Sequence, residues 1–420
     1  MSAPTQQRWH RRGGGAALGM LAIVILGVGL GFGRADVALL GLPLAATAAI
    51  ALRRPVGTAS LAVGTRVGDD AVVAEVRVAA PAGVDLVVLS SGAYEEPSTT
   101  VVVGARQARS MEARLPVLHS GPQEVLRVHG RVVAAGGDLV QHLEPAVARA
   151  VVAPARERVT SLVLPHRLTN RPGGHAARRL GDGLDFRDLA PFAPGDRLRR
   201  IDWRATARSP RSDSDLIVRR MDATAEAAAV IVLDSRDDVG AAIAEWASDR
   251  PARKGTSSLD LARPAAAAIA ASYLEAGDRV AFHDLTRTGA SARSGGGRRK
   301  LEQIRAVVTR TTARPGASIT APVLPAAAVV HLVSTFLDED VADLAVLWRS
   351  AGHRVVAVDV LPAPSLEGAD DAHRLAHRVL LLERADRLDR LRRVGVTVVP
   401  WQDADRDVLL RQAERARGPR

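Results

Sequence analysis

The residues best suited to chemistry directly follow a continuous apolar run at residues 227–233, where the chain reads Asp234, Ser235, Arg236, Asp237, Asp238. Such a run is typical of a buried parallel strand, and ligands of open parallel sheets bind outside the carboxyl ends of strands. Convergent carboxylate and hydroxyl oxygens would bind a hard divalent cation, with Thr256 or Ser257 and Asp338 as further ligands. A guanidinium would repel that cation. The sequence therefore predicts no metal at Asp234, which would instead cap the following turn or helix.

The sequence lacks the residues that several other classes of reaction require. The chain has no cysteine, which excludes thiol nucleophiles, disulfides and cysteine-bound metals. We find no phosphate loop ending in Gly-Lys-Ser/Thr, no H-E-x-x-H and no G-x-S-x-G. The eleven histidines are scattered along the chain, among them His166, His175, His283, His331 and His353. We therefore expect neither catalytic residues nor a bound cofactor.

A second feature is the charged stretch at residues 181–208. It interleaves acids with arginines around three aromatic rings, Phe186, Phe192 and Trp203. Such a density of opposite charge with rings and a Pro-Gly turn predicts a folded ion-pair network. Two interpretations stay open. The rings could form a structural core inside paired charges, or the charged surface could be a docking site for a partner, with the candidates Arg187, Asp196, Arg199, Asp202, Arg204 and Arg208.

The order of residues in this stretch resembles a known family. G-x-G-x-D-F from Gly181, Pro-Gly-Asp at Pro194, and I-D-W-x-A-T-A-R from Ile201 are similar to the signature of the domain of unknown function 58 family. Arg197 departs from the second acid that the family often carries after Pro-Gly-Asp. The resemblance implies a membrane-anchored bacterial protein with a von Willebrand A-type domain, which works beside a MoxR-type AAA+ ATPase. In such domains a D-x-S-x-S metal site follows the first strand, and here Arg236 and Asp238 occupy the two serine positions.

Charge is concentrated in one part of the chain. The net charge is +11, and residues 156–220 hold fifteen arginines against eight acidic residues. A local basic surface suits an acidic partner or a membrane surface. No nucleic-acid module accompanies it, so no nucleic-acid partner is expected.

The N-terminal region is apolar in two segments. Residues 13–33 carry no charge, and residues 37–52 add a second uncharged run. Both lengths approach that of a membrane span, and they predict a helical hairpin in the lipid bilayer. Arginines at positions 8, 11, 12, 53 and 54 flank the hairpin, so both flanks and the soluble domains are expected in the cytoplasm at the inner membrane. The alternative is a cleaved signal peptide over residues 1–35.

Four segments follow from these patterns. We expect a cytoplasmic N-terminus with two transmembrane helices at residues 1–54 and a small β-sandwich at 55–155, where short alternating runs are punctuated by Gly, Pro and Asp. The signature segment occupies 156–225. Residues 226–420 alternate strands and helices, which predicts a doubly wound parallel α/β sheet of von Willebrand A type.

The function predicted from these features is that of a non-catalytic adaptor or scaffold, acting with a MoxR-type ATPase in complex assembly or envelope-related processes. Two alternatives remain. One is a membrane-tethered metal-dependent enzyme with its site near Asp234, and the other is a sensor or scaffold that works without an ATPase.

Overall fold

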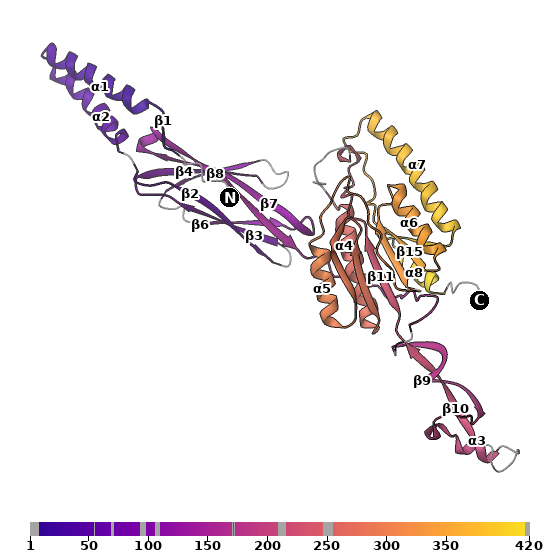
Figure 1. The fold of residues 1–420 in the computed structure, drawn as a ribbon. Helices are drawn as coiled ribbons and strands as arrows, with labels where there is room; N and C mark the ends of the chain where they lie inside the picture. Colours follow the sequence, from indigo (N-terminus) through magenta and orange to yellow (C-terminus); the bar gives the residue numbers. More distant parts are fainter. Residues whose placement is uncertain are drawn as a thin grey trace. The chain divides into compact units, whose positions relative to one another are not determined.

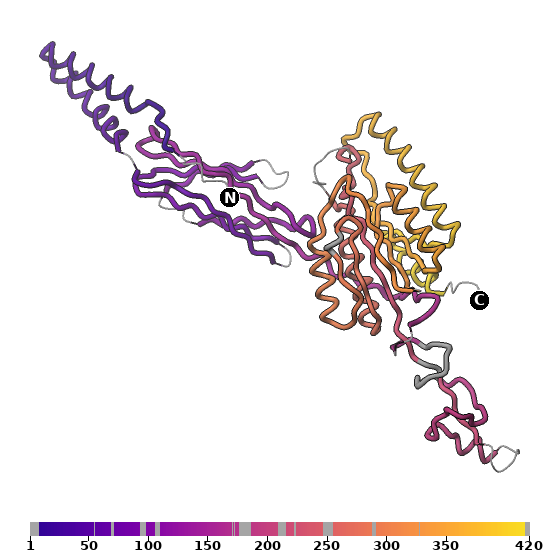
Figure 2. Tube along the Cα trace, viewed as in Figure 1, coloured from indigo at the N-terminus to yellow at the C-terminus, as the bar shows by residue number. Residues whose placement is uncertain are grey.

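The computed structural model describes residues 8–53, 55–68, 71–92, 98–105, 110–169, 171, 173–208, 216–246, 255–326 and 328–415 (Figures 1 and 2). The chain forms two compact units. Unit 1 comprises Met1–Leu118 and Pro122–Val152, and unit 2 comprises His119–Gly121 and Ala153–Arg420. We describe each unit by itself.

Unit 1 begins with two apolar helices, α1 (Gly14–Gly31) and α2 (Ala35–Ala51), which pack antiparallel. A Cβ added at Gly15 would lie 2.3 Å from the Cβ of Ala51, and one at Gly29 would lie 2.4 Å from the backbone nitrogen of Ala38. Only glycine permits this approach at both ends. Within the described residues, α1 is long and apolar enough to cross a membrane, and α2 is a shorter apolar helix.

The rest of unit 1 consists of two sheets around one core. A five-stranded sheet has the order β1 (His10–Arg11), β8 (Leu139–Val152), β7 (Gly121–Ala134), β4 (Val84–Gly92), β5 (Thr99–Gly104), and a three-stranded sheet has the order β2 (Ser60–Val67), β3 (Ala71–Ala79), β6 (Ser110–Pro116). Alternate residues of both sheets, among them Val72, Val76, Val87, Leu89 and Val128, are buried in this core. A short helix, η1 (Ala135–Gly137), joins β7 to β8.

Unit 2 is built on a six-stranded sheet. Its order is β13 (Arg287–Gly295), β12 (Arg279–Asp284), β11 (Ala228–Leu233), β14 (Val329–Ser334), β15 (Arg354–Asp359), β16 (Thr397–Pro400). All neighbours from β12 to β16 pair in parallel, and β13 joins the edge antiparallel. The chain passes from β11 to β12 and then returns to β14 on the other side of β11. The carboxyl ends of β11 and β14 therefore flank the point where the strand order reverses.

Helices cover both faces of this sheet because its strands are apolar on both faces. Ala229, Ile231 and Leu233 pack under α4 (Ser258–Glu275), α5 (Arg298–Thr309) and α8 (Arg406–Arg415), while Val230 and Val232 face α6 (Glu339–Ser350) and the end of α7 (Asp371–Arg393). A short helix, η3 (Ile243–Glu245), precedes α4.

The signature residues form a two-stranded unit inside unit 2. Strands β9 (His175–Pro191) and β10 (Ile217–Ala225) pair antiparallel with two register shifts, and η2 (Leu198–Arg200) and α3 (Trp203–Arg208) lie between them in sequence and contact β10. At its base, His175 Nε2 lies 2.8 Å from Asp278 Oδ2, and Asp278 also accepts a hydrogen bond from the backbone of Ala227. Buried Asp278 thus ties this β9–β10 segment to the start of β11.

Candidate functional site

Asp234 lies where the strand order of the six-stranded sheet reverses. Its backbone N–H donates to the carbonyl of Val333, and its Oδ2 accepts a 2.8 Å hydrogen bond from Ser334 Oγ at the end of β14. Both side chains are buried. The sheet therefore brings together an aspartate and a serine, 100 residues apart, at the edge where α/β sheets bind ligands.

Arg236 forms a buried ion pair with the carboxylate of Asp234. Its Nε and one terminal nitrogen donate to the two oxygens at 3.0 and 3.2 Å, a bidentate pair with both side chains buried. The other terminal nitrogen lies 3.0 Å from Asp338 and 3.4 Å from Asp340. One guanidinium therefore makes ion pairs with three carboxylates.

The neighbouring residues are also engaged. Ser235 Oγ donates to Asp284 Oδ1 at 2.6 Å, and Asp238 accepts a hydrogen bond from the backbone of Leu259 in the first turn of α4. Ser257, a candidate ligand by sequence, caps α4 through a capping box with Asp260. Ser257 therefore has a structural role, and Thr256 is exposed beside it.

Asp237 differs from its neighbours in the size of its pKa shift. Burial, followed by repulsion from Asp234 and Asp338, raises its pKa to about 6. The charge of Arg236 opposes this shift but does not cancel it. Within the described residues, no group of three or more His, Asp or Glu side chains is arranged to hold a metal ion.

Two histidines that sequence alone left scattered have buried partners. Tyr273 donates its hydroxyl to the carbonyl of Val163 at 2.6 Å, and His331 Nε2 lies 2.9 Å from that hydroxyl. Burial and the charge of Arg354 lower the pKa of His331 to about 3, so this ring is neutral at physiological pH. His119 Nδ1 lies 2.6 Å from Asp260 at the start of α4.

The structure corrects the predicted placement of the aromatic rings. Phe186 is 56 % exposed and Trp203 is 67 % exposed, and Phe192 is half-buried. The prediction of a buried Trp203 assumed an extended stretch with alternating faces. Trp203 instead begins α3, so side chains repeat every three to four residues there. The prediction of a ring core is therefore wrong for Phe186 and Trp203.

Helix α3 has a polar inner side and an exposed outer side. Thr206 Oγ1 accepts a hydrogen bond from the backbone of Ile217, which ties the inner side to β10. Trp203, Arg204, Ala207 and Arg208 are all exposed. They form one face, because positions i, i+1, i+4 and i+5 lie together on a helix.

The two aspartates proposed for docking act within the segment itself. Asp202 accepts hydrogen bonds from the backbones of Ala205 and Arg204 and a third from the side chain of Arg219, and these bonds lower its pKa. Asp196 accepts one from the backbone of Ala193. Arg187 and Arg199, like Arg204 and Arg208, are exposed. Asp196 and Asp202 thus hold the loop and the start of α3, while these four arginines lie at the surface.

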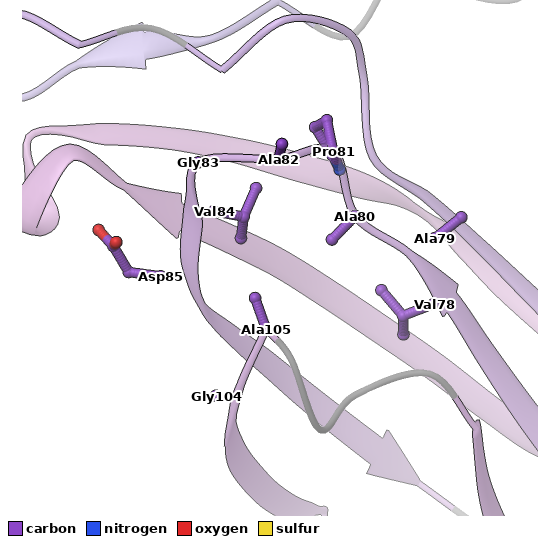
Figure 3. Close-up of a pocket in the computed structure, with 10 residues that line it drawn as sticks. All are labelled: Val78, Ala79, Ala80, Pro81, Ala82, Gly83, Val84, Asp85, Gly104 and Ala105. Atoms are coloured by element: carbon purple, nitrogen blue, oxygen red, sulfur yellow. The ribbon is translucent and has the colours of Figure 1, made fainter.

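One cavity of unit 1 carries little chemistry. It has a volume of about 880 Å³ and is lined by residues 78–85 with Gly104 and Ala105 (Figure 3). Asp85 is the one ionisable residue of this lining, and its carboxylate accepts the backbone N–H of Gly136. The other lining residues are valine, alanine, proline and glycine, so no other side chain of the lining is polar.

A parallel α/β sheet with its polar site at the strand reversal defines the general class of this unit. Residues 188–366 match the model of a family described as "Protein of unknown function DUF58". This stretch runs from the end of β9 past β15, and over these residues the chain is similar to that family. No curated protein matches the chain.

Proposed function

We propose that this protein is a non-catalytic, membrane-anchored adaptor that binds a partner protein through the exposed face of α3. The observation that carries the proposal is the exposure of Trp203 on a helix held in place by Thr206 and Asp202. Exposed tryptophan and arginine dominate binding energy at many protein interfaces. The resemblance to the DUF58 family supplies the partner class, a MoxR-type AAA+ ATPase.

The α/β sheet of unit 2 is consistent with a von Willebrand A-type domain whose metal site has changed. Asp234 follows the first strand of the sheet, as in the D-x-S-x-S motif of such domains. The guanidinium of Arg236 pairs with both oxygens of this aspartate. A divalent cation would have to displace a buried bidentate pair before it could bind, so this edge favours a binding role over metal-dependent catalysis.

Membrane anchoring by a two-helix hairpin is supported by strand pairing within unit 1. Strand β1 precedes α1, yet it pairs with β8, which follows α2. The backbone of Arg12 also donates to Asp138, which lies after β7. If α1 alone crossed the membrane, these partners would lie on opposite sides. Two crossings return the chain to the same side, and removal of residues 1–35 as a signal peptide would remove β1.

Orientation follows from the flanking charges. Arg8, Arg11 and Arg12 precede α1 and Arg53 follows α2, while the turn holds Arg34 paired with Asp36 at 2.7 Å. The excess of arginine on the flanks favours their retention in the cytoplasm. Both units would then share a compartment with a cytoplasmic ATPase.

The docking proposal is tested by capture of a purified MoxR-type ATPase on the full-length protein in detergent. Trp203→Ala is expected to reduce capture about tenfold, the effect of losing a modest interface anchor. Because the ring is exposed, the free energy of unfolding should change by less than about 0.5 kcal/mol. Arg208→Glu should also weaken capture, and the weakening should fade at high salt.

Leu347→Ala and Arg299→Glu, which change an exposed leucine on α6 and an exposed arginine on α5, serve as matched controls. Equal capture by all four variants would remove the α3 face from the proposal. Loss of stability in Trp203→Ala would show that the ring is structural.

The metal-dependent alternative is tested by calorimetric titration with Mn²⁺. The wild-type protein is expected to bind no more tightly than millimolar. Arg236→Ser frees the carboxylate oxygens of Asp234 and Asp338 and should bind Mn²⁺ more tightly. Micromolar binding by the wild type that Asp234→Ala abolishes would favour the enzyme over the adaptor.

A further inference from the structure

Helix α7 carries apolar side chains on the side that faces away from the protein. Its inner side packs on unit 2, where Leu388 and Leu391 are buried, the ring of His377 contacts Trp246, and Arg384 bonds the carbonyl of Thr335. At 100° per residue these positions share one face. In Figure 1, α7 lies on the outer side of α6.

The opposite side of α7 is a stripe of Leu375, Val379 and Leu382, which are 65 %, 49 % and 62 % exposed. These residues lie about 180° from the packed face. Single exposed leucines are ordinary on protein surfaces. Three at spacings of four and three residues are the repeat by which one helix packs against another in a coiled coil.

The charged residues beside this stripe indicate which helix could pack on it. With Val379 at heptad position a and the two leucines at d, Arg378 occupies g and Glu383 occupies e. In a parallel pair of identical helices, position g of one faces the e position five residues later in the other. Arg378 of each copy would therefore face Glu383 of its partner, twice by symmetry. An antiparallel pair sets g against g and e against e, and loses both contacts.

We propose that α7 pairs in parallel with α7 of a second copy of this chain, through Leu375, Val379 and Leu382 with two Arg378–Glu383 ion pairs. The next a position is Asp386, so the contact covers about two turns and is weak in dilute solution. Anchoring two copies in one membrane raises their effective concentration, which favours the pair there. This inference stands on α7 alone and does not require the ATPase.

Cross-linking in membranes tests the pairing directly, because the chain has no cysteine and each introduced thiol is unique. Full-length Val379→Cys is reconstituted in phosphatidylcholine liposomes and oxidised. Position a lies at the symmetric contact, so a disulfide-linked dimer is expected. The control, Ala385→Cys, is exposed on the same helix but off the stripe, and should stay monomeric. Equal cross-linking of both variants would overturn the proposal.

Charge reversal in the Val379→Cys background identifies the occupant. Arg378→Glu and Glu383→Arg should each reduce the dimer about fivefold, since two attractive pairs become repulsive. The double variant Arg378→Glu/Glu383→Arg should restore it. Glu383 also pairs with Arg387 of its own helix at 3.3 Å. The double variant also lacks this pair within the helix. If its disulfide-linked dimer returns, the cause must therefore be the contact between the two copies.

A double variant that stays as weak as the single ones would overturn parallel self-pairing, and the stripe would then belong to a different protein. Normal capture of the ATPase by the double variant, alongside lost cross-linking in the single ones, would separate this contact from the α3 face. Failure of either experiment leaves the other interpretable.

Discussion

At the scale of single residues, the Asp234 edge is a problem of charge balance. Asp234, Asp237, Asp338 and Asp340 gather around one cation, Arg236. The arginine pairs with Asp234, Asp338 and Asp340. The pKa of the fourth carboxylate, Asp237, is raised by burial and by repulsion from Asp234 and Asp338. The guanidinium of Arg236 holds this site together, so we expect a charge change here to alter stability more than a change on an exposed face.

Asp237→Asn tests this balance through pH. The pKa of Asp237 in the folded chain is about 6, above its ordinary value of 3.8. The folded state therefore holds the proton more tightly, and the wild type loses stability as pH rises from about 4 to about 6. The variant lacks this loss. At pH 8 it should be more stable than the wild type by about 1–2 kcal/mol after allowance for solvent screening.

The measurement is urea unfolding at pH 4 and pH 8. Asp386→Asn, an exposed aspartate of α7, is the control and should shift both curves little. A gain for Asp237→Asn that is the same at both pH values would contradict the assigned charge repulsion.

At the scale of elements, the start of α4 positions the Asp234 edge. Ser257 and Asp260 form a capping box, and Asp260 also binds Ser120 and His119. Burial opposes the charge of Asp260, but these hydrogen bonds outweigh burial and lower its pKa. Asp238 bonds the first turn of the same helix. The loop after β11 thus depends on where α4 begins.

Ser257→Ala removes the cap from α4 and should lower the free energy of unfolding by about 1 kcal/mol, with a range of about 0.5–2. Ser350→Ala removes a hydroxyl that bonds the last turn of α6 at an exposed position. It should cost less than about 0.5 kcal/mol. Urea midpoints compare the two, and equal losses would show that the capping box does not stabilise α4.

At the scale of the whole molecule, β1 pairs with β8 although two apolar helices separate them in the chain, which agrees with the proposed hairpin of two membrane crossings. Thiol labelling in intact cells checks this arrangement, with single cysteines at Ala35, the first residue of α2, and at Ser60, in β2. An impermeant reagent should label only Ala35→Cys. Ser60→Cys should react after the membrane is permeabilised. Labelling of Ser60→Cys alone would reverse the proposed orientation.

Sequence patterns predicted part of the architecture. The continuous apolar run at residues 227–233 predicted β11, because a strand buried on both faces has no polar face to interrupt it. Strands β9 and β10 were missed because register shifts break their alternation.

The amino-acid sequence by itself determined the chemistry that the chain lacks, the apolar N-terminus, the alternation of strands and helices, and the position of Asp234 after a buried strand. These depend on residue type and local period. Only the tertiary structure decided that Arg236 pairs with Asp234, that Trp203 faces outward on α3, and that β1 pairs with β8 across the apolar helices. Each of these joins residues through packing and register. A one-dimensional pattern carries neither the distance between two side chains nor the face on which a ring lies.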